Sequence, residues 1–166
     1  SGKDRFTFYE NGVVSINPPV AGDIVGGRAT RTTHPRVLRG IEELFSTLLE
    51  RPIQIENPLQ WLTKREVTML LQRAGMADLL ARTNSCTKPH TWTRAHMHCG
   101  ACSQCIDRRF GILAAGMAEY EPATNYKIDL LTADRSASDN LRMAVSYVSF
   151  FKKVVATPKE RFVVDF

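Results

Sequence analysis

The sequence lacks the features that would assign it to a membrane or secreted class. It contains no apolar run of about eighteen residues, which excludes a membrane-spanning helix. Its first ten residues, SGKDRFTFYE, contain neither an apolar signal segment nor an initiator Met. We therefore expect a cytoplasmic protein without a signal peptide, and a chain that is part of a longer parent protein.

Blocks of like charge are also absent, although the formal net charge is +5. This charge favours anionic partners in general. The aromatic residues are not interleaved with Lys and Arg, so the charge alone is weak support for nucleic-acid binding. No GxxxxGK[ST] phosphate loop occurs either, and Gly22, Gly26 and Gly27 lack the strand-then-helix context of such a loop.

What is present is the composition of an ordinary soluble globular protein, with 166 residues of which 43% are hydrophobic. Aromatic and β-branched runs on either side of Asn11-Gly12 predict a hairpin over residues 5–16. Residues 17–34 are expected to form a loop, and residues 52–57 a short strand. Apolar residues at helical spacing predict helices over about 35–49, 63–75, 106–117 and 137–155. Pro35 suits the first turn of the first helix, and Gly75 is expected as the left-handed cap that ends the second. The last of these is apolar on more than one face, so we expect it to pack against another surface.

All four cysteines lie between residues 86 and 105, in the pattern of one Cys followed by CxxCxxC. Thiolates are preferred ligands of tetrahedral Zn²⁺, and four of them close its coordination shell. We therefore predict a structural zinc site formed by Cys86, Cys99, Cys102 and Cys105.

Four alternatives to four-thiolate zinc remain open. An iron–sulfur cluster also uses CxxCxxC, but its run usually continues to a nearby fourth Cys. Disulfides are disfavoured by the expected reducing compartment and by the crowding of three thiols, and the thiols could also stay without metal. His90, His96 and His98 lie between the cysteines, where any of them could replace a thiolate ligand.

Three blocks of sequence occur in order: TTHPRVLRGIEELFSTLL, PIQIENPLQWLTKREVTMLLQRAGM, and the cysteine block TNSCT…HCGACSQCIDRRFGI. Together they resemble the C-terminal half of the 7-cyano-7-deazaguanine synthase (QueC/ExsB) family. In this resemblance the family's four zinc thiolates fall on the four cysteines. The gap from Cys86 to Cys99 is several residues longer than is usual for the family, and residues 1–29 do not match. The chain is thus similar to a branch that diverges from the housekeeping queuosine enzyme.

The resemblance implies that the parent is an α/β protein with the parallel-sheet PP-loop ATP pyrophosphatase fold. It implies an ATP- and Mg²⁺-dependent ligase that adenylates a carboxylated deazapurine for amide or nitrile formation. The family's Ser-Gly-Gly-x-Asp-Ser ATP loop is missing here, so we expect this chain alone to be inactive. It would pack against the absent N-terminal domain or form a homodimer.

This chain itself is then expected to be mainly helical with short strands and a four-Cys zinc loop. Residues 1–34 would form the hairpin and the glycine-broken loop, and residues 35–166 the helical, zinc-containing part. A rival interpretation is a non-enzymatic zinc-ribbon-like module that binds nucleic acid or protein, which the net charge and the cysteines would also suit.

Four polar residues are candidates for contact with an anionic substrate or phosphate. Arg28 and Arg31 lie in the glycine-broken loop just before a helix start, and guanidinium groups suit carboxylate and phosphate. Asp107 and Arg108 follow the last cysteine directly, so a bound metal would fix their position. No catalytic residue is predicted.

Overall fold

The computed structural model describes residues 3–16, 32–91, 93–136 and 138–161. The chain divides into two compact units, Ser1–Thr63 and Lys64–Phe166, which we treat separately. The predicted division between residues 34 and 35 falls inside the first unit. Most of the described elements are helices, and the strands are two short parallel ones, which confirms the mainly helical prediction. Within the described ranges no helix is long and apolar enough to cross a membrane.

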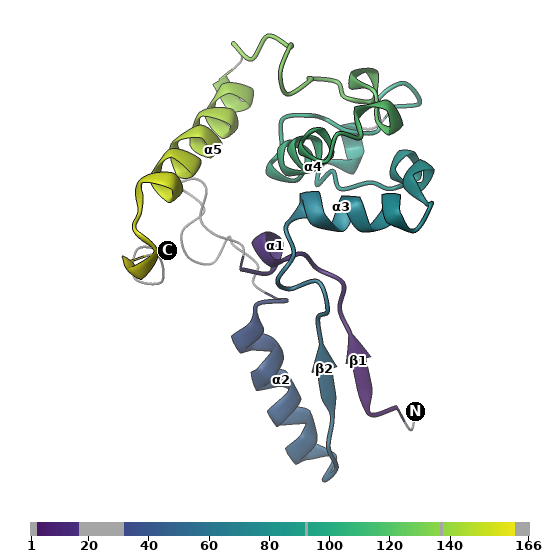
Figure 1. The fold of residues 1–166 in the computed structure, drawn as a ribbon, viewed down its shortest axis with the longest axis vertical. Coiled ribbons are helices and arrows are strands. Elements are labelled where there is room, and N and C mark those ends of the chain that lie inside the picture. Colours follow the sequence, from purple (N-terminus) through teal and green to yellow (C-terminus); the bar gives the residue numbers. More distant parts are fainter. Residues whose placement is uncertain (1–2, 17–31, 92, 137, 162–166) are drawn as a thin grey trace. The chain divides into compact units, whose positions relative to one another are not determined.

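In the first unit, β1 (Arg5–Thr7) pairs in parallel with β2 (Gln54–Glu56), and Phe6 lies opposite Ile55. Figure 1 shows the two strands side by side, next to α2 (Pro35–Leu48). The helix begins as predicted, with Pro35 in its first turn and the His34 side chain accepting a hydrogen bond from the Arg36 N–H. Glu42 of α2 accepts a hydrogen bond from the Ile55 N–H at 2.7 Å, which ties the helix to β2.

The predicted hairpin over residues 5–16 is wrong. After β1 the chain forms a short helix, α1 (Gly12–Ile16), and the partner strand comes from 49 residues further along the chain. The Asn11 side chain accepts a hydrogen bond from the Val14 N–H, so this Asn starts a helix and not a tight turn. A Cβ on Gly12 would lie 2.3 Å from the carbonyl oxygen of Gln60. The Asn-Gly pair therefore serves a helix start and a close backbone approach.

In the second unit, α3 (Lys64–Arg73) packs against α4 (Ser103–Ala114). The contact is close because a Cβ on Gly111 of α4 would lie 2.9 Å from the Lys64 side chain. Both helices are followed by a glycine in the left-handed conformation, Gly75 with φ 68° and Gly116 with φ 72°. The cap at Gly75 was predicted from sequence. The apolar core beside these helix ends consists of Ala77, Leu80, Ile112 and Met117.

Short 3₁₀ helices connect the remaining parts of this unit. They are η2 (Ala77–Arg82), η3 (Pro89–Thr91), η4 (Ala118–Tyr120), η5 (Ala123–Asn125) and η6 (Lys159–Arg161). After η5 the chain meets the cysteine loop at a parallel bridge between His98 and Tyr126. These connections bring residues 121–135 next to the cysteines.

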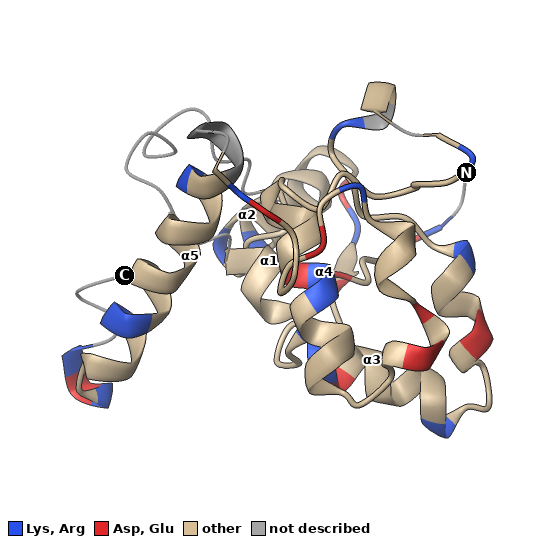
Figure 2. Cartoon of the chain, turned by 90° about the horizontal axis from the view of Figure 1, so that it is seen from above, with Lys and Arg blue, Asp and Glu red and all other residues tan. Residues whose placement is uncertain are grey.

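The last helix, α5 (Ser138–Ala156), matches the predicted range closely. The Tyr147 hydroxyl donates a hydrogen bond to the Ser103 carbonyl of α4, and Phe151 stacks on Phe110. Figure 2 shows that the middle of α5 carries no charged side chains. Several of its apolar side chains are exposed, among them Val148 at 54% and Val155 at 85%. The helix thus keeps an apolar surface that the described residues do not cover.

Candidate metal centre

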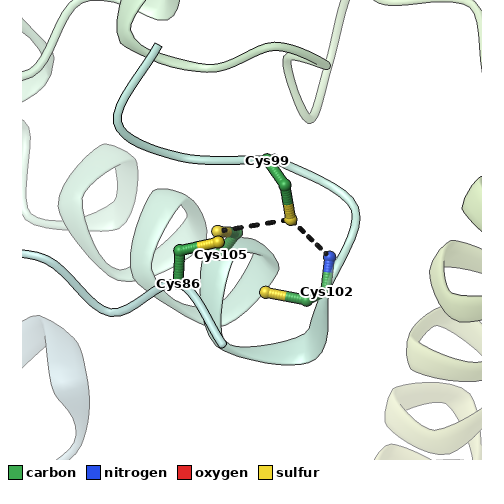
Figure 3. Close-up of side chains that lie close together, drawn as sticks. All are labelled: Cys86, Cys99, Cys102 and Cys105. Carbon is green, nitrogen blue, oxygen red and sulfur yellow. Dashed lines mark hydrogen bonds between the residues drawn. The ribbon is translucent and has the colours of Figure 1, made fainter. Parts of the chain in front are cut away.

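The four cysteines come together as the sequence predicts. Their Sγ atoms all lie within 4.8 Å of one another, and every one of the four residues is buried (Figure 3). The Sγ atoms of Cys99 and Cys105 are 3.9 Å apart. A tetrahedral ion with Zn–S bonds of about 2.3 Å requires sulfur–sulfur distances of about 3.8 Å. The cluster therefore has the ligand type and the spacing for a single tetrahedral metal ion.

Local backbone structure explains how the CxxCxxC segment turns its sulfurs inward. Gly100 has φ 73°, and a Cβ there would lie only 1.7 Å from the carbonyl oxygen of Ile128. The turn at Gly100 lets the Cys102 N–H donate a hydrogen bond to the Cys99 sulfur at 3.3 Å. Cys102 then occupies the N-cap position of α4, and Cys105 lies in the first turn of that helix. Glycine is required at this position both by its conformation and by the crossing chain.

The fourth cysteine reaches the cluster from the other side of a twelve-residue loop, Thr87–His98. The Asn84 side chain accepts a hydrogen bond from the Cys86 N–H at 2.6 Å and donates one to the Met97 carbonyl at 2.8 Å. The Lys88 N–H donates to the Cys86 sulfur at 3.4 Å. Asn84 thus joins the two ends of the loop, which was not foreseen from the sequence.

Burial and neighbouring thiols shift the pKa values of the clustered cysteines in opposite directions. A hydrogen bond from the Cys105 thiol lowers the pKa of Cys102 to about 4, although burial opposes this change. The same hydrogen bond, together with burial, raises the pKa of Cys105, and burial raises that of Cys99. A bound cation would replace these protons and stabilise the remaining thiolates.

The alternatives to a single metal ion fit this geometry less well. None of the four cysteines forms a disulfide, so the disulfide alternative finds no support. An iron–sulfur cluster distributes its four thiolates over two or four irons, so some of its cysteine sulfurs lie further apart than four sulfurs that share one ion. The histidines are not part of the sulfur cluster: His90 is exposed, the His96 ring lies 2.9 Å from the Thr124 carbonyl, and His98 stacks on Tyr126.

The structure places Arg108 inside a buried polar network beside the cysteines. Its guanidinium donates to the Glu121 carboxylate, to the Thr83 hydroxyl at 2.8 Å and to the Leu80 carbonyl at 2.7 Å. Glu121 is fully buried, and its other carboxylate oxygen accepts a hydrogen bond from the Tyr126 hydroxyl. All guanidinium nitrogens of Arg108 are therefore engaged within the unit, and its contact with a substrate stays a prediction.

A second buried ion pair continues this network. Arg109 donates to the Asp129 carboxylate at 3.2 Å and to the Glu121 carbonyl at 2.5 Å. Burial opposes the ionised form of Asp129, but hydrogen bonds from Leu131 and Thr132 and the charge of Arg109 lower its pKa overall. The network of Arg108, Arg109, Glu121, Tyr126 and Asp129 was missed at the sequence level. The sequence does not distinguish the four charged residues of this network from the exposed charged residues around them.

The other predicted site residues have different surroundings. Asp107 forms an ion pair with Lys64 at 2.9 Å, and it lines a groove of about 690 Å³ between α4 and α5. Arg28 and Arg31 lie outside the described residues, so the structure does not locate them. Contact of Asp107, Arg28 and Arg31 with an anion stays a prediction.

Comparison with known proteins agrees with the cysteine geometry. The sequence model of the family described as queuosine biosynthesis protein QueC matches residues 34–116, a range that contains all four cysteines. A relative from Sphingopyxis alaskensis, named 7-cyano-7-deazaguanine synthase 1, is 34% identical over 90 residues. That alignment covers 51% of this chain and 38% of the relative, so the chain spans well under half of the relative's length. No solved structure matches. The chain belongs to the QueC family, because the family's sequence model matches half of it.

Proposed function

We propose that this chain is the zinc-containing C-terminal portion of a QueC-like ATP-dependent ligase. The parent would adenylate a carboxylated deazapurine and convert it to an amide or a nitrile, with ATP and Mg²⁺ bound by its N-terminal domain. The observation that supports this most directly is the four-cysteine cluster inside the range that matches the family. The name of the Sphingopyxis relative supports the same class of substrate.

The metal in this proposal is zinc with a structural role. A four-thiolate shell leaves no open coordination position for water or substrate, so a bound zinc supplies rigidity. A bound zinc would fix the start of α4, because Cys102 and Cys105 lie there, and it would thereby position Asp107 and Arg108 on the same helix. Free thiols of this kind suit a reducing compartment such as the cytoplasm.

Metal analysis of protein purified without added metal tests the zinc part of the proposal. We expect about one zinc per chain, and a cobalt-substituted sample with the absorption of four thiolate ligands. Substitution of exposed His90 by Ala should leave the metal content unchanged, which makes it a matched control for ligands in the same loop. Iron with visible colour, or two disulfides by mass spectrometry, would contradict four-thiolate zinc.

Pyrophosphate release tests the enzymatic part. The purified chain should release none from ATP, because it has no phosphate-binding glycine loop. The full-length parent should release pyrophosphate only when a carboxylated deazapurine is present. Release by the chain alone would contradict the proposal. A zinc-loaded parent that is inactive with every carboxylated deazapurine, and instead binds nucleic acid or protein, would favour the zinc-ribbon-like alternative.

We further propose that the exposed apolar side of α5 packs against the N-terminal domain of the parent. The groove between α4 and α5 is lined mainly by apolar side chains, including Phe110, Leu131 and Val148, and each of these is at least half exposed in the chain by itself. Complete burial of a fully exposed apolar side chain contributes about 1.5–3 kcal/mol, so covering the exposed part of each of these would contribute roughly half of that or slightly more. Hydrogen exchange along α5 should be slower in the parent than in the chain. Equal exchange in the parent and in the chain would mean that α5 makes no such contact. Protection that increases with the concentration of the chain would instead support a homodimer.

A further inference from the structure

The segment from Asn125 to Arg135, which we call the crossing segment, runs directly over the cysteine loop. The His98 N–H donates to the Asn125 carbonyl at 3.2 Å, and the Lys127 N–H donates to the His98 carbonyl at 2.9 Å. One step further, the Ile128 carbonyl fills the place where a side chain at Gly100 would lie. The crossing segment therefore packs against the backbone that holds Cys99.

Arg135, at the end of the crossing segment, reaches back to this backbone. Its Nη2 donates to the Gly100 carbonyl at 3.0 Å and to the Asp129 carbonyl at 3.1 Å. Its Nε and Nη1 atoms are buried and have no hydrogen-bond partner among the described residues. The guanidinium is thus held in place by one nitrogen while its two other nitrogens are withdrawn from water.

Such an arrangement is costly unless a negative charge lies nearby. A guanidinium stays protonated in proteins, and burial of a charge without a partner is strongly unfavourable. The Asp129 carboxylate, one candidate, already accepts hydrogen bonds from Arg109, Leu131 and Thr132. Burial lowers the pKa of Arg135, and the charges of Asp129 and Cys99 oppose this change. The hydrogen bond to the Gly100 carbonyl places the guanidinium next to the segment that follows Cys99, so the cysteine cluster is a second candidate for the negative charge.

The metal-bound cluster has the charge that this position lacks. Four thiolates around one divalent cation carry a net charge of −2. Backbone N–H groups donate to the sulfurs of Cys86 and Cys99, but these dipoles carry no full charge. We propose that Arg135 stabilises the metal-bound form of the cluster by placing a buried positive charge beside the Cys99–Gly100 segment. This inference rests on the proposed zinc site and makes Arg135 a positioning and charge-balancing residue for it.

Zinc titration of the unfolded, chelator-treated chain measures this effect without requiring a stable metal-free fold. Refolding is followed by circular dichroism against free zinc, and the midpoint gives the apparent affinity. Arg135→Met should weaken the affinity by about tenfold to a hundredfold, the usual range for groups around a metal's ligands. Arg135→Lys keeps the charge and should stay within about threefold of wild type. Arg94→Met removes an exposed charge from the Cys86–Cys99 loop and should have no effect.

Further comparisons distinguish the charge of Arg135 from its hydrogen bond to the Gly100 carbonyl. Arg135→Gln retains an amide donor for the Gly100 carbonyl but not the charge, so it should resemble Arg135→Met. If Lys and Met variants lose affinity equally, or if Gln restores it, hydrogen bonding is the role and the proposal is wrong. Unchanged affinity in the Met variant would also overturn it. If the wild-type chain binds no zinc at all, the proposed metal site fails first, and that outcome is separate from any difference among the Arg135 variants.

Discussion

Replacement of Glu121 by Gln tests whether the buried polar network stabilises the second unit. Glu121 is fully buried, and its carboxylate accepts hydrogen bonds from Arg108 and Tyr126. Gln has nearly the same shape but no charge, so it leaves the Arg108 guanidinium buried without its counter-ion. The His98 ring, whose Nε2 is 3.9 Å from Glu121, does not provide another charge, because burial and Arg108 lower its pKa.

The expected loss is large compared with the stability of a domain. Breaking a buried ion pair by removing one partner typically costs about 3–5 kcal/mol. Total unfolding free energies are about 5–15 kcal/mol, so the variant should be strongly destabilised. Urea denaturation of the zinc-loaded protein, followed by fluorescence and circular dichroism, measures the difference in free energy of unfolding.

Glu119→Gln is the matched control, since Glu119 is exposed and lies two residues away in η4. It should change the free energy of unfolding by less than about 0.5 kcal/mol. The double variant Arg108→Met/Glu121→Gln should lose much less free energy of unfolding than the sum of the losses in the two single variants, because the two residues share one interaction. A loss below about 1 kcal/mol for Glu121→Gln, or simple additivity with Arg108→Met, would show that the network does not stabilise the fold as the geometry implies.

Three further predictions concern single positions. Gly100→Ala should lower the free energy of unfolding by at least about 2 kcal/mol, because Gly100 has a left-handed backbone and the Ile128 carbonyl occupies the place of a Cβ. Gly40→Ala in α2 should instead raise it by up to about 1 kcal/mol, because no atom lies near that Cβ position. Denaturation curves of the two variants measure both changes. Cys102→Ser and treatment with a chelator should both lower the melting temperature, and unchanged melting in both would argue against a structural metal. Arg31→Ala in the parent should reduce turnover about tenfold to a hundredfold without a change in melting temperature, with little rescue by Lys; wild-type kinetics would mean that this loop does not contact the anion.

The features that could be predicted from the sequence are those set by local chemistry. The cysteine spacing predicted that these four residues would come together, because few roles other than a metal site require four cysteines within 20 residues in this pattern. Two helices lie where apolar periodicity predicted them, and their ends lie at the expected residues, Pro35 and Gly75. These signals act over one or two turns of chain, so distant residues do not alter them.

The features that could not be predicted depend on residues far apart in the sequence. Asn11-Gly12 is an ambiguous signal, and the parallel partner of β1 and the close approach of Gln60 decide in favour of a helix start. The hydrogen bonds from the Arg108 guanidinium to Glu121 and Thr83 were likewise not expected, because those residues are 13 and 25 positions away in the sequence. Nothing in the local sequence distinguishes a buried ion pair from a solvated one.

The loop between Cys86 and Cys99 has a consequence for how this family can vary in length. Its two ends are joined by the Asn84 side chain and would be joined again by a shared metal ion. Extension of a loop whose ends are already fixed costs only about 0.6 kcal/mol for each doubling of its length. A segment closed in this way can accept insertions while the residues on either side keep their places. The loop between Cys86 and Cys99 is therefore a suitable place to insert an affinity tag or a fluorescent label without disturbing α3 and α4.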